Sequence, residues 1–286
     1  MKRILAALVL LAAAIILRGA ITTVDGIIAG MRPPEDFLKV GGTMEAAGVH
    51  HSLFYTSGRP GGATAPTSGL AGAALTAYSG QIPWVNPGSG NSYIARLQAT
   101  GSQTGCLLLL DRLWHNSGIA VTTTSAQTIN SAAWPARDRE GTANGENILV
   151  AIEVSTATTN GSAIANTTLS YTNQAGTSGR TATIASFPAT AVAGTFVPFQ
   201  LAAGDTGVRS IQSITLGTSY GGGAIHLVAY RILARLELPI ANTGGAIDAV
   251  SGGFVRCFDN TVPFLVWLPT STTGVTVAGQ LIITQG

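Results

Sequence analysis

Short apolar segments separated by glycine- and proline-containing turn signals fill residues 106–286, and this alternation constrains the fold more than any other feature. Within 147–154, for example, Ile148, Val150 and Ile152 share one face of a strand with a period of two. Apolar runs of strand length lie at 106–115, 147–154, 168–171, 180–184, 195–201, 208–216, 225–238, 262–268 and 275–283. Neither an amphipathic helical period nor a βα alternation accompanies them. The pattern predicts an all-β fold, a β-sandwich of the jelly-roll type.

The longest of these segments, 225–238, has two unlike faces. One face carries mainly apolar residues together with His226, and a buried, hydrogen-bonded histidine is the expected state there. The other face carries Arg231, Arg235 and Glu237. We therefore expect the second half of this face to be wetted or to form a polar interface.

Residues 19–105 differ in character from the rest, because turn signals dominate and apolar runs are short. Pro33-Pro34, Gly41-Gly42 and the Asn-Pro-Gly-Ser-Gly run at 86–90 interrupt any regular element. A loop-rich segment of this length cannot stabilise itself. It is predicted to be an extended arm with short edge strands that lies along the sandwich domain, residues 106–286, or along a neighbouring subunit.

The first 18 residues form a hydrophobic leader. Met-Lys-Arg is followed by a 14-residue apolar run, 4–17, and then by Arg18. That length fits the apolar region of a signal peptide better than a membrane-spanning helix. An export signal, a hydrophobic arm that docks on a neighbour, and sequence added by an upstream start codon all remain open, and the pattern alone favours export. Any membrane contact would then be transient.

Composition excludes several classes of protein. Charged residues make up 10% of the chain, and lysine occurs only at positions 2 and 39, which excludes a coiled coil. The formal net charge is +2, and without residues 1–18 the count is 12 basic and 13 acidic residues. Direct nucleic-acid binding through a basic surface is therefore not expected.

No pattern of metal-ligating residues occurs. Cys106 and Cys257 belong to no CxxC or Cys/His spacing, so two buried free thiols are favoured over one long-range disulfide. His50 and His51 are adjacent, and on a strand their rings would point to opposite faces. The expected metal and cofactor content is none.

Catalytic patterns are equally weak. Residues 217–221 match the GxSxG nucleophile elbow around Ser219, but a strand follows instead of a helix, and no acid separates Ser219 from His226, the last histidine. A glycosidase needs two acids across a cleft with aromatic platforms for the sugar, and among 13 acidic residues no pair stands out, Asp138 and Glu140 included. We therefore predict that the protein is not an enzyme and has no catalytic residues.

The densest charge cluster in the chain lies at 137–140 and is predicted to be an exposed loop. Such a loop makes ion pairs with solvent or with a neighbouring subunit, and we favour the inter-subunit role. The candidate inter-subunit contacts are the residues of this cluster and the charged residues of 225–238: Arg137, Asp138, Arg139, Glu140, Arg231, Arg235 and Glu237.

Three segments resemble virion proteins of tailed bacteriophages, of the capsid-associated or decoration type. They are Ile-Thr-Thr-Val-Asp-Gly-Ile-Ile-Ala-Gly-Met-Arg-Pro-Pro at 21–34, the strand 107–114 with its Asp-Arg-Leu-Trp, and Ser-Tyr-Thr-Asn-Gln-Ala-Gly-Thr-Ser-Gly-Arg-Thr-Ala-Thr at 170–183. In that group the chain would begin near Ile21, so the leader departs from the pattern. The resemblance implies a virion location and a structural protein that forms a homo-oligomer, such as a trimer, and contacts the major capsid protein.

Two other functions stay open at this point. A functional leader would favour a secreted bacterial surface or carbohydrate-binding β-sandwich, and a hydrolase on a β scaffold would lose activity with one acid or histidine. Within the virion, a tail or fibre component is an alternative to a capsid position. Low charge favours assembly, because a surface of hydroxyl, amide and small apolar groups loses its water cheaply against identical neighbours.

Overall fold

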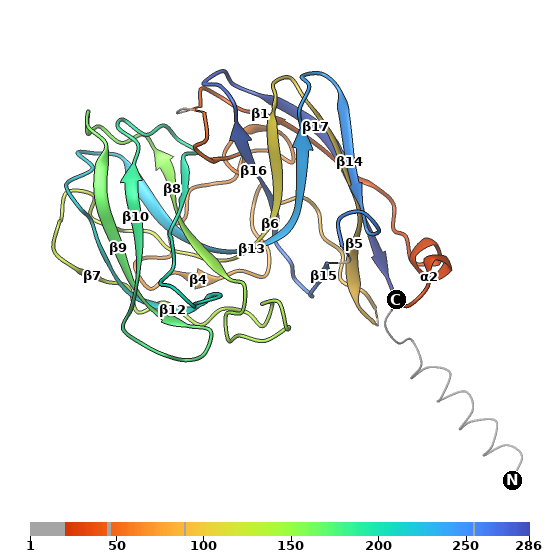
Figure 1. The fold of residues 1–286 in the computed structure, drawn as a ribbon, viewed down its shortest axis with the longest axis horizontal. Coiled ribbons are helices and arrows are strands. Elements are labelled where there is room, and N and C mark those ends of the chain that lie inside the picture. Colours follow the sequence, from red (N-terminus) through yellow and green to blue (C-terminus); the bar gives the residue numbers. More distant parts are fainter. Residues whose placement is uncertain (1–20, 45–46, 89, 254) are drawn as a thin grey trace, which may run out of the picture.

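The computed structural model describes residues 21–44, 47–88, 90–253 and 255–286, and nearly all of its regular structure is β (Figure 1). The single helix among the described residues is α2 (Val24–Ala29), capped by the Thr23 hydroxyl, which accepts a hydrogen bond from the backbone N–H of Gly26. All strand pairs are antiparallel. The prediction of an all-β sandwich is confirmed. The hydrophobic leader, residues 1–18, lies outside the described residues.

The strands form three sheets. The central sheet has the order β11 (Phe196–Pro198), β8 (Leu149–Thr156), β13 (Ala224–Leu238), β6 (Gly105–His115), β16 (Pro263–Pro269) and β2 (His51–Ser52), with β4 (Ala73–Ala74) paired to β6. A six-stranded sheet has the order β14 (Gly244–Asp248), β5 (Ser92–Gly101), β17 (Thr276–Gln285), β1 (Glu35–Val40) and β3 (Ser57–Arg59), with β15 (Arg256–Cys257) paired to β5. A four-stranded sheet has the order β10 (Arg180–Phe187), β9 (Ile164–Asn173), β12 (Val208–Thr215) and β7 (Gln127–Thr128).

One face of the central sheet serves two hydrophobic cores. Near the N-terminal half of β13, Ile225 and Leu227 pack into the core beneath the four-stranded sheet. Near its C-terminal half, Leu236 and Leu238 pack into the core beneath the six-stranded sheet. Register shifts in the pairing of β13 with β6 mark bulges, which bend strands and re-aim side chains. The long strand therefore crosses from one sandwich to the other (Figure 1).

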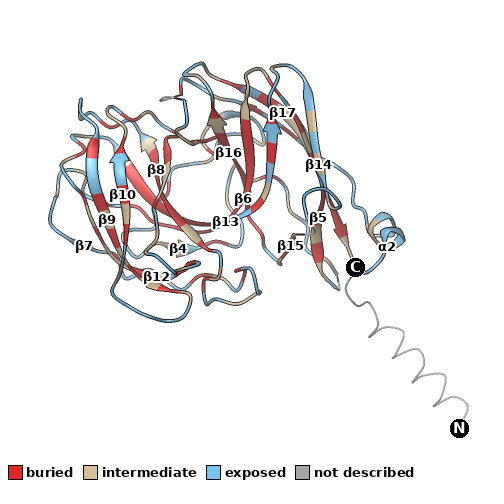
Figure 2. Cartoon of the chain, in the orientation of Figure 1, coloured by how far each residue is buried: buried red, intermediate tan, exposed pale blue. Residues whose placement is uncertain are grey.

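The opposite face of the central sheet is covered by residues of the N-terminal segment. Phe54, partly buried Tyr55 and partly buried Tyr78 pack there against Phe264 and Tyr230. Figure 2 shows the result: buried positions dominate β6, β8 and β16. Such strands, buried on both faces, read in sequence as continuous apolar runs, as 106–115 does.

The segment 19–105 also contributes to the sheets themselves. β5 is ten residues long and lies inside the six-stranded sheet between β14 and β17, unlike the edge strands predicted for this segment. Its small residues, such as Ala95 and Ala99, are buried but give little hydrophobic contrast in the sequence. Within the described ranges, no helix combines the length and apolarity needed to cross a membrane.

Candidate functional site

Arg137, predicted on an exposed loop, is buried and paired. Its Nε lies 3.0 Å from Oδ2 of Asp111 and its Nη2 lies 3.1 Å from Oδ1, a two-pronged contact. Its Nη1 donates to the carbonyl of Leu75 at 2.7 Å. The predicted exposure is wrong for Arg137, because a buried carboxylate on β6 draws the guanidinium inward.

Asp138 is also buried, so the predicted exposure is wrong for this residue as well. Its carboxylate accepts hydrogen bonds from the backbone N–H groups of Glu140, Thr142, Gly145 and Glu146, and from the Thr142 hydroxyl at 2.6 Å. Burial alone would raise the pKa of Asp138, but these hydrogen bonds outweigh it and lower the pKa below its usual value. Asp138 thus organises the turn that carries Arg139.

Four of the predicted contact residues are exposed. Arg139 lies 3.6 Å from Glu140, and Arg235 lies 2.7 Å from Glu237, both as solvent-exposed ion pairs. Exposed pairs of this kind contribute little to stability. Their role between subunits stays a prediction.

Arg231 is the exception on the charged face of β13, because only 4% of it is exposed. Its Nη2 donates to the carbonyl of Arg256 at 2.9 Å, and its guanidinium carbon lies 5.1 Å from the centre of the Phe258 ring. Its Nε has no hydrogen-bond partner among the described residues. On the neighbouring strand its pairing partner is Asp111, whose carboxylate is held by Arg137.

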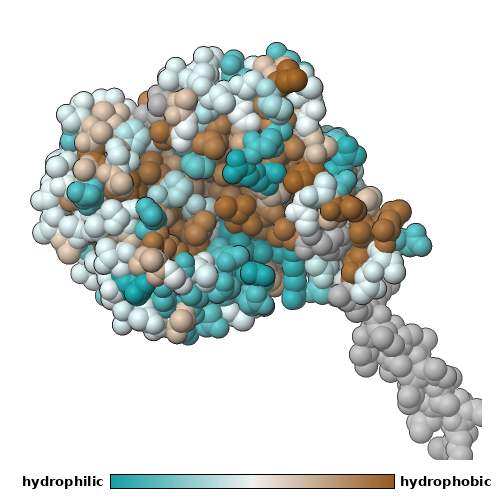
Figure 3. All heavy atoms as spheres, in the orientation of Figure 1, coloured by the Kyte–Doolittle hydropathy of each residue, from teal (hydrophilic) through white to brown (hydrophobic). Residues whose placement is uncertain are grey.

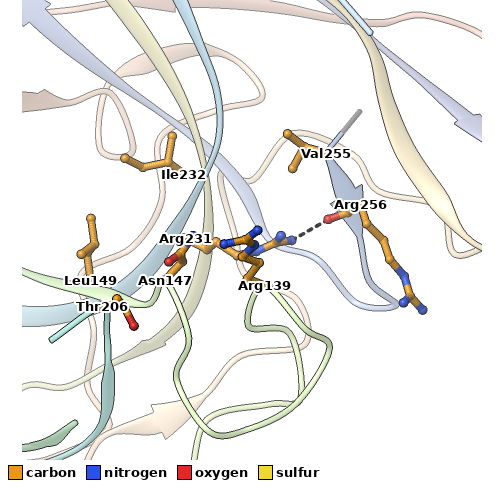
Figure 4. A pocket seen from close by; sticks show the side chains of 8 residues that line it. All are labelled: Arg139, Asn147, Leu149, Thr206, Arg231, Ile232, Val255 and Arg256. Carbon is orange, nitrogen blue, oxygen red and sulfur yellow. Dashed lines mark hydrogen bonds between the residues drawn. The ribbon is translucent and has the colours of Figure 1, made fainter. Parts of the chain in front are cut away.

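The fold brings Arg139 and Arg231 to one cavity of about 530 Å³ (Figure 4). The described residues that line it are Arg139, Asn147, Leu149, Thr206, Arg231, Ile232, Val255 and Arg256. None of these is acidic. The volume falls within the range of small-ligand sites. In Figure 4 the Arg256 side chain extends away from the two other arginines, while its carbonyl meets Arg231.

Local structure fixes each part of this lining. Arg139 is held by the Asp138 turn, and its backbone N–H donates to the carbonyl of Glu146 at 3.1 Å. Arg231 and Ile232 come from β13 between its two register shifts, which place consecutive residues at the same opening. Two carboxylates lie nearby: Glu140 beside Arg139, and Glu146, which accepts a hydrogen bond from the Thr206 hydroxyl.

A second charged cluster was missed in the sequence. Arg112 on β6 makes a two-pronged ion pair with Glu153 on β8, with distances of 3.0 and 2.7 Å, and both side chains are fully buried. The Tyr55 hydroxyl donates to Glu153 at 2.7 Å, and Arg112 Nε donates to Nδ1 of His115 at 3.1 Å. Two charged residues inside otherwise apolar strands were the available signal, since buried charges need partners.

The groups of this cluster determine one another's protonation states. Burial alone would raise the pKa of Glu153, but Arg112 and the hydrogen bonds from Ser52 and Tyr55 lower it below its usual value. Burial and the neighbouring Arg112 charge lower the pKa of His115 to about 3. The cluster is therefore an anion–cation pair with a neutral histidine.

The remaining sequence candidates have structural surroundings. His226 is buried and lies 2.7 Å from the Ser155 hydroxyl and 2.8 Å from the Asn116 carbonyl, as predicted for a hydrogen-bonded core histidine. Ser219 accepts a hydrogen bond from the Gly221 N–H in the turn that leads into β13. Cys106 and Cys257 are buried and free. Among the described residues, no group of three or more His, Cys, Asp or Glu side chains could hold a metal ion.

Comparisons with known proteins give little. No family model matches the chain, and no curated protein shows significant similarity to it. Among solved structures, the VP2 subviral particle of infectious bursal disease virus is 11% identical, with 90% of this chain and 80% of that chain covered and a TM-score of 0.19. The T=1 particle derived from the same virus is 10% identical, with 89% and 77% covered and a TM-score of 0.18. This is a weak structural similarity to viral capsid proteins.

Proposed function

We propose that this chain is a non-enzymatic structural protein of a tailed-bacteriophage particle, where it forms a homo-oligomer on or in the capsid. The segments at 21–34, 107–114 and 170–183 support the virion part of this proposal through their resemblance to phage virion proteins. The assembly part rests on the surface of the six-stranded sheet.

The observation that carries the assembly proposal is the inverted pattern of β1. This strand turns Lys39 inward, where its Nζ donates to the carbonyls of Pro60 and Gly61 at 2.9 and 3.2 Å. It leaves Leu38 and Val40 on the outer face, 40% and 46% exposed. A strand at a permanently wet surface would ordinarily do the reverse.

The middle of this outer face is uncharged, and the charges lie around it: Arg59 beside Leu38, Asp36 beside Gln280, and Arg96 beside Asp248. The register places Leu38 beside Ala278, Ala278 beside Thr100, and Thr100 beside Gly244. The next row joins Gln280 to Gln98, whose side chains are hydrogen-bonded at 2.7 Å. This uncharged middle loses its hydration at low cost, so a neighbouring subunit can cover it favourably, with the surrounding charges at the polar rim of the contact.

Exposed apolar residues continue beside this sheet. Val24, Ile28 and Met31 are each about half exposed or more at α2, and Met31 bridges to Thr284 of β17. Hydrophobic residues gather at α2 on the face seen in Figure 3. Exposed apolar residues thus lie near both ends of β17, with Leu38 and Val40 at one end and the α2 residues at the other, and exposed apolar clusters are typical of interaction sites.

Several charged side chains of the protomer are buried and do not contribute to its surface. Seven charged side chains of the described residues are buried: Lys39, Asp111, Arg112, Arg137, Asp138, Glu153 and Arg231. This leaves an outside dominated by hydroxyl, amide and small apolar groups, which suits repeated contacts in a symmetric assembly.

The test is the substitution Leu38→Glu on the full chain, followed by sedimentation velocity. A carboxylate on this face should dissociate the oligomer into folded monomers, while Thr181→Glu, at an exposed position of β10, should leave the oligomer intact. A wild-type protein that sediments as a monomer at all concentrations would overturn the assembly proposal. Mass spectrometry of purified phage particles tests the virion location. If no peptide of this protein is found in the particles, the virion part of the proposal is overturned.

A further inference from the structure

The cavity between β13 and the Asp138 turn contains a buried cation whose charge no acid neutralises by direct contact. Only 4% of Arg231 is exposed. No carboxylate among the described residues lies within ion-pair distance of it. The nearest candidate by register, Asp111, is bound on both oxygens by Arg137 and also accepts the Val262 N–H. Burying an arginine without an anionic partner costs desolvation free energy, unless a bound group supplies the opposite charge.

The guanidinium nitrogens of Arg231 differ in their hydrogen bonding. Its Nη2 is taken by the Arg256 carbonyl, whereas its Nε has no partner. The Nε is enclosed and has no surface open to the cavity, so an anion in the cavity cannot reach it. The Nη1 nitrogen also has no hydrogen-bond partner among the described residues and is not enclosed in this way, so it is the donor that a carboxylate or phosphate oxygen can reach. Arg139 lines the same cavity (Figure 4), and its only ionic partner among the described residues is the exposed Glu140 at 3.6 Å, a weak pair that leaves Arg139 able to attract an anion.

We propose that this cavity binds an oxyanion, a carboxylate or a phosphate, between Arg231 and Arg139. Arg231 supplies the buried donor, and Arg139 supplies a solvent-exposed charge that attracts the anion at the entrance. Because the anion would accept from Arg231 Nη1 and lie close to Arg139, it supplies the carboxylate or phosphate charge that the protomer does not place beside Arg231.

The remaining lining selects among oxyanions. Leu149, Ile232 and Val255 give the cavity an apolar wall, and Ile232 is 44% exposed without a ligand. An anion that carries a short alkyl chain can therefore place its head at Arg231 and its tail on this wall. Each buried CH₂ group tightens binding by at most about fourfold. Carboxylates with a tail should bind more tightly than acetate.

The experiment uses the full chain and isothermal titration calorimetry with inorganic phosphate, acetate and hexanoate as probes. Saturable binding is expected, with hexanoate tighter than acetate. Arg139→Gln should weaken each probe about two- to fivefold, the usual effect of removing one exposed charge. Arg235→Gln is the matched control, since it removes an exposed arginine of β13 that does not line this cavity.

Arg231→Lys tests the buried donor directly, because it keeps the charge but cannot donate to the Arg256 carbonyl and to the anion with the same planar geometry. We expect it to abolish measurable binding of the carboxylates. If this variant does not fold, Arg139→Gln and Arg235→Gln still decide the matter. Equal binding by these two variants, or no binding of any probe to the wild type at millimolar concentration, would overturn the proposal.

Two sources of the oxyanion are separated by sedimentation velocity on the same variants. If the natural anion is a free small molecule, Arg139→Gln and Arg231→Lys leave the association state unchanged. If it is an aspartate or glutamate of a second copy, both variants dissociate the oligomer, and added phosphate does so in the wild type. The site is independent of the outer face of the six-stranded sheet, so Leu38→Glu should not alter probe binding.

Discussion

Two buried arginines on adjacent strands of the central sheet have opposite surroundings. Arg112 on β6 is completely buried. Its guanidinium pairs with Glu153, donates a hydrogen bond to His115 and lies over the Phe54 ring. Arg231 on β13 is nearly as buried, yet it meets one carbonyl and one aromatic ring and no carboxylate. The difference follows from what covers each face: the N-terminal segment closes the cluster around Arg112, whereas a cavity opens at Arg231.

This contrast distinguishes two roles of a buried arginine. Arg112 stabilises the protomer through its ion pair, whereas Arg231 is available to a partner or ligand outside the protomer. A buried ion pair becomes costly only when one partner is removed, because the other charge then remains unsatisfied. An unpaired buried arginine already carries that cost. The following predictions test whether the two arginines differ in this way.

The largest effect is expected at the enclosed pair. Arg112→Met should lower the free energy of unfolding by about 3–5 kcal/mol, because Glu153 would stay buried without its cation. Urea denaturation followed by tryptophan fluorescence measures this loss. A change below about 1 kcal/mol would show that the pair does not hold the N-terminal segment on the sheet.

Acid should weaken the same cluster through His115. Its pKa is about 3 in the folded protein, against an ordinary value near 6.5. The unfolded chain therefore binds more protons between these values, so stability is complete above pH 6.5 and falls as the pH drops below it. This one histidine accounts for a loss of about 2 kcal/mol at pH 5.

The measurement compares unfolding at pH 7.5 and pH 5 in the wild type and in His115→Gln. The variant should show a smaller loss between the two pH values, since the group that takes up the proton is gone. His51, with a pKa of about 4, contributes with the same sign and remains in both proteins. An identical pH dependence in both proteins would contradict the assignment to His115.

Arg231→Met is expected to behave unlike Arg112→Met. It removes a buried charge without leaving a carboxylate unpaired, so the free energy of unfolding should change by about 1 kcal/mol or less, in either direction. Measured under the same conditions as Arg112→Met, a loss as large as that variant's would mean that Arg231 also has a structural partner and would erase the contrast.

The smallest effect belongs to the exposed pair on the last part of β13. Glu237→Gln removes the partner of Arg235, and exposed pairs contribute about 0.2–1 kcal/mol. We expect a change below about 0.5 kcal/mol that shrinks further in 0.5 M salt. A larger, salt-insensitive effect would assign Arg235 and Glu237 to the stability of the protomer.

The sequence predicted some of the candidate site residues but not their roles. Arg139 and Arg231 were both expected at an interface, and the structure brings them to one cavity, although 92 positions separate them by number. Arg137 and Asp138 sit in the same charge cluster as Arg139, yet both turn inward. No local pattern distinguishes these neighbours, because the partner of Arg137 lies 26 residues away on β6.

The sequence by itself determined the strands and turns of this protein. Periodicity, β-branched and apolar residues, and Gly or Pro turns act over a few residues, so each strand could be predicted where its pattern was strong. Only the tertiary structure decided which charges are paired, because the pairs join β6 to β8 and β6 to the Asp138 turn across long loops. The same packing leaves Arg231 buried without a carboxylate, since three-dimensional contact, unlike strand formation, has no local signal.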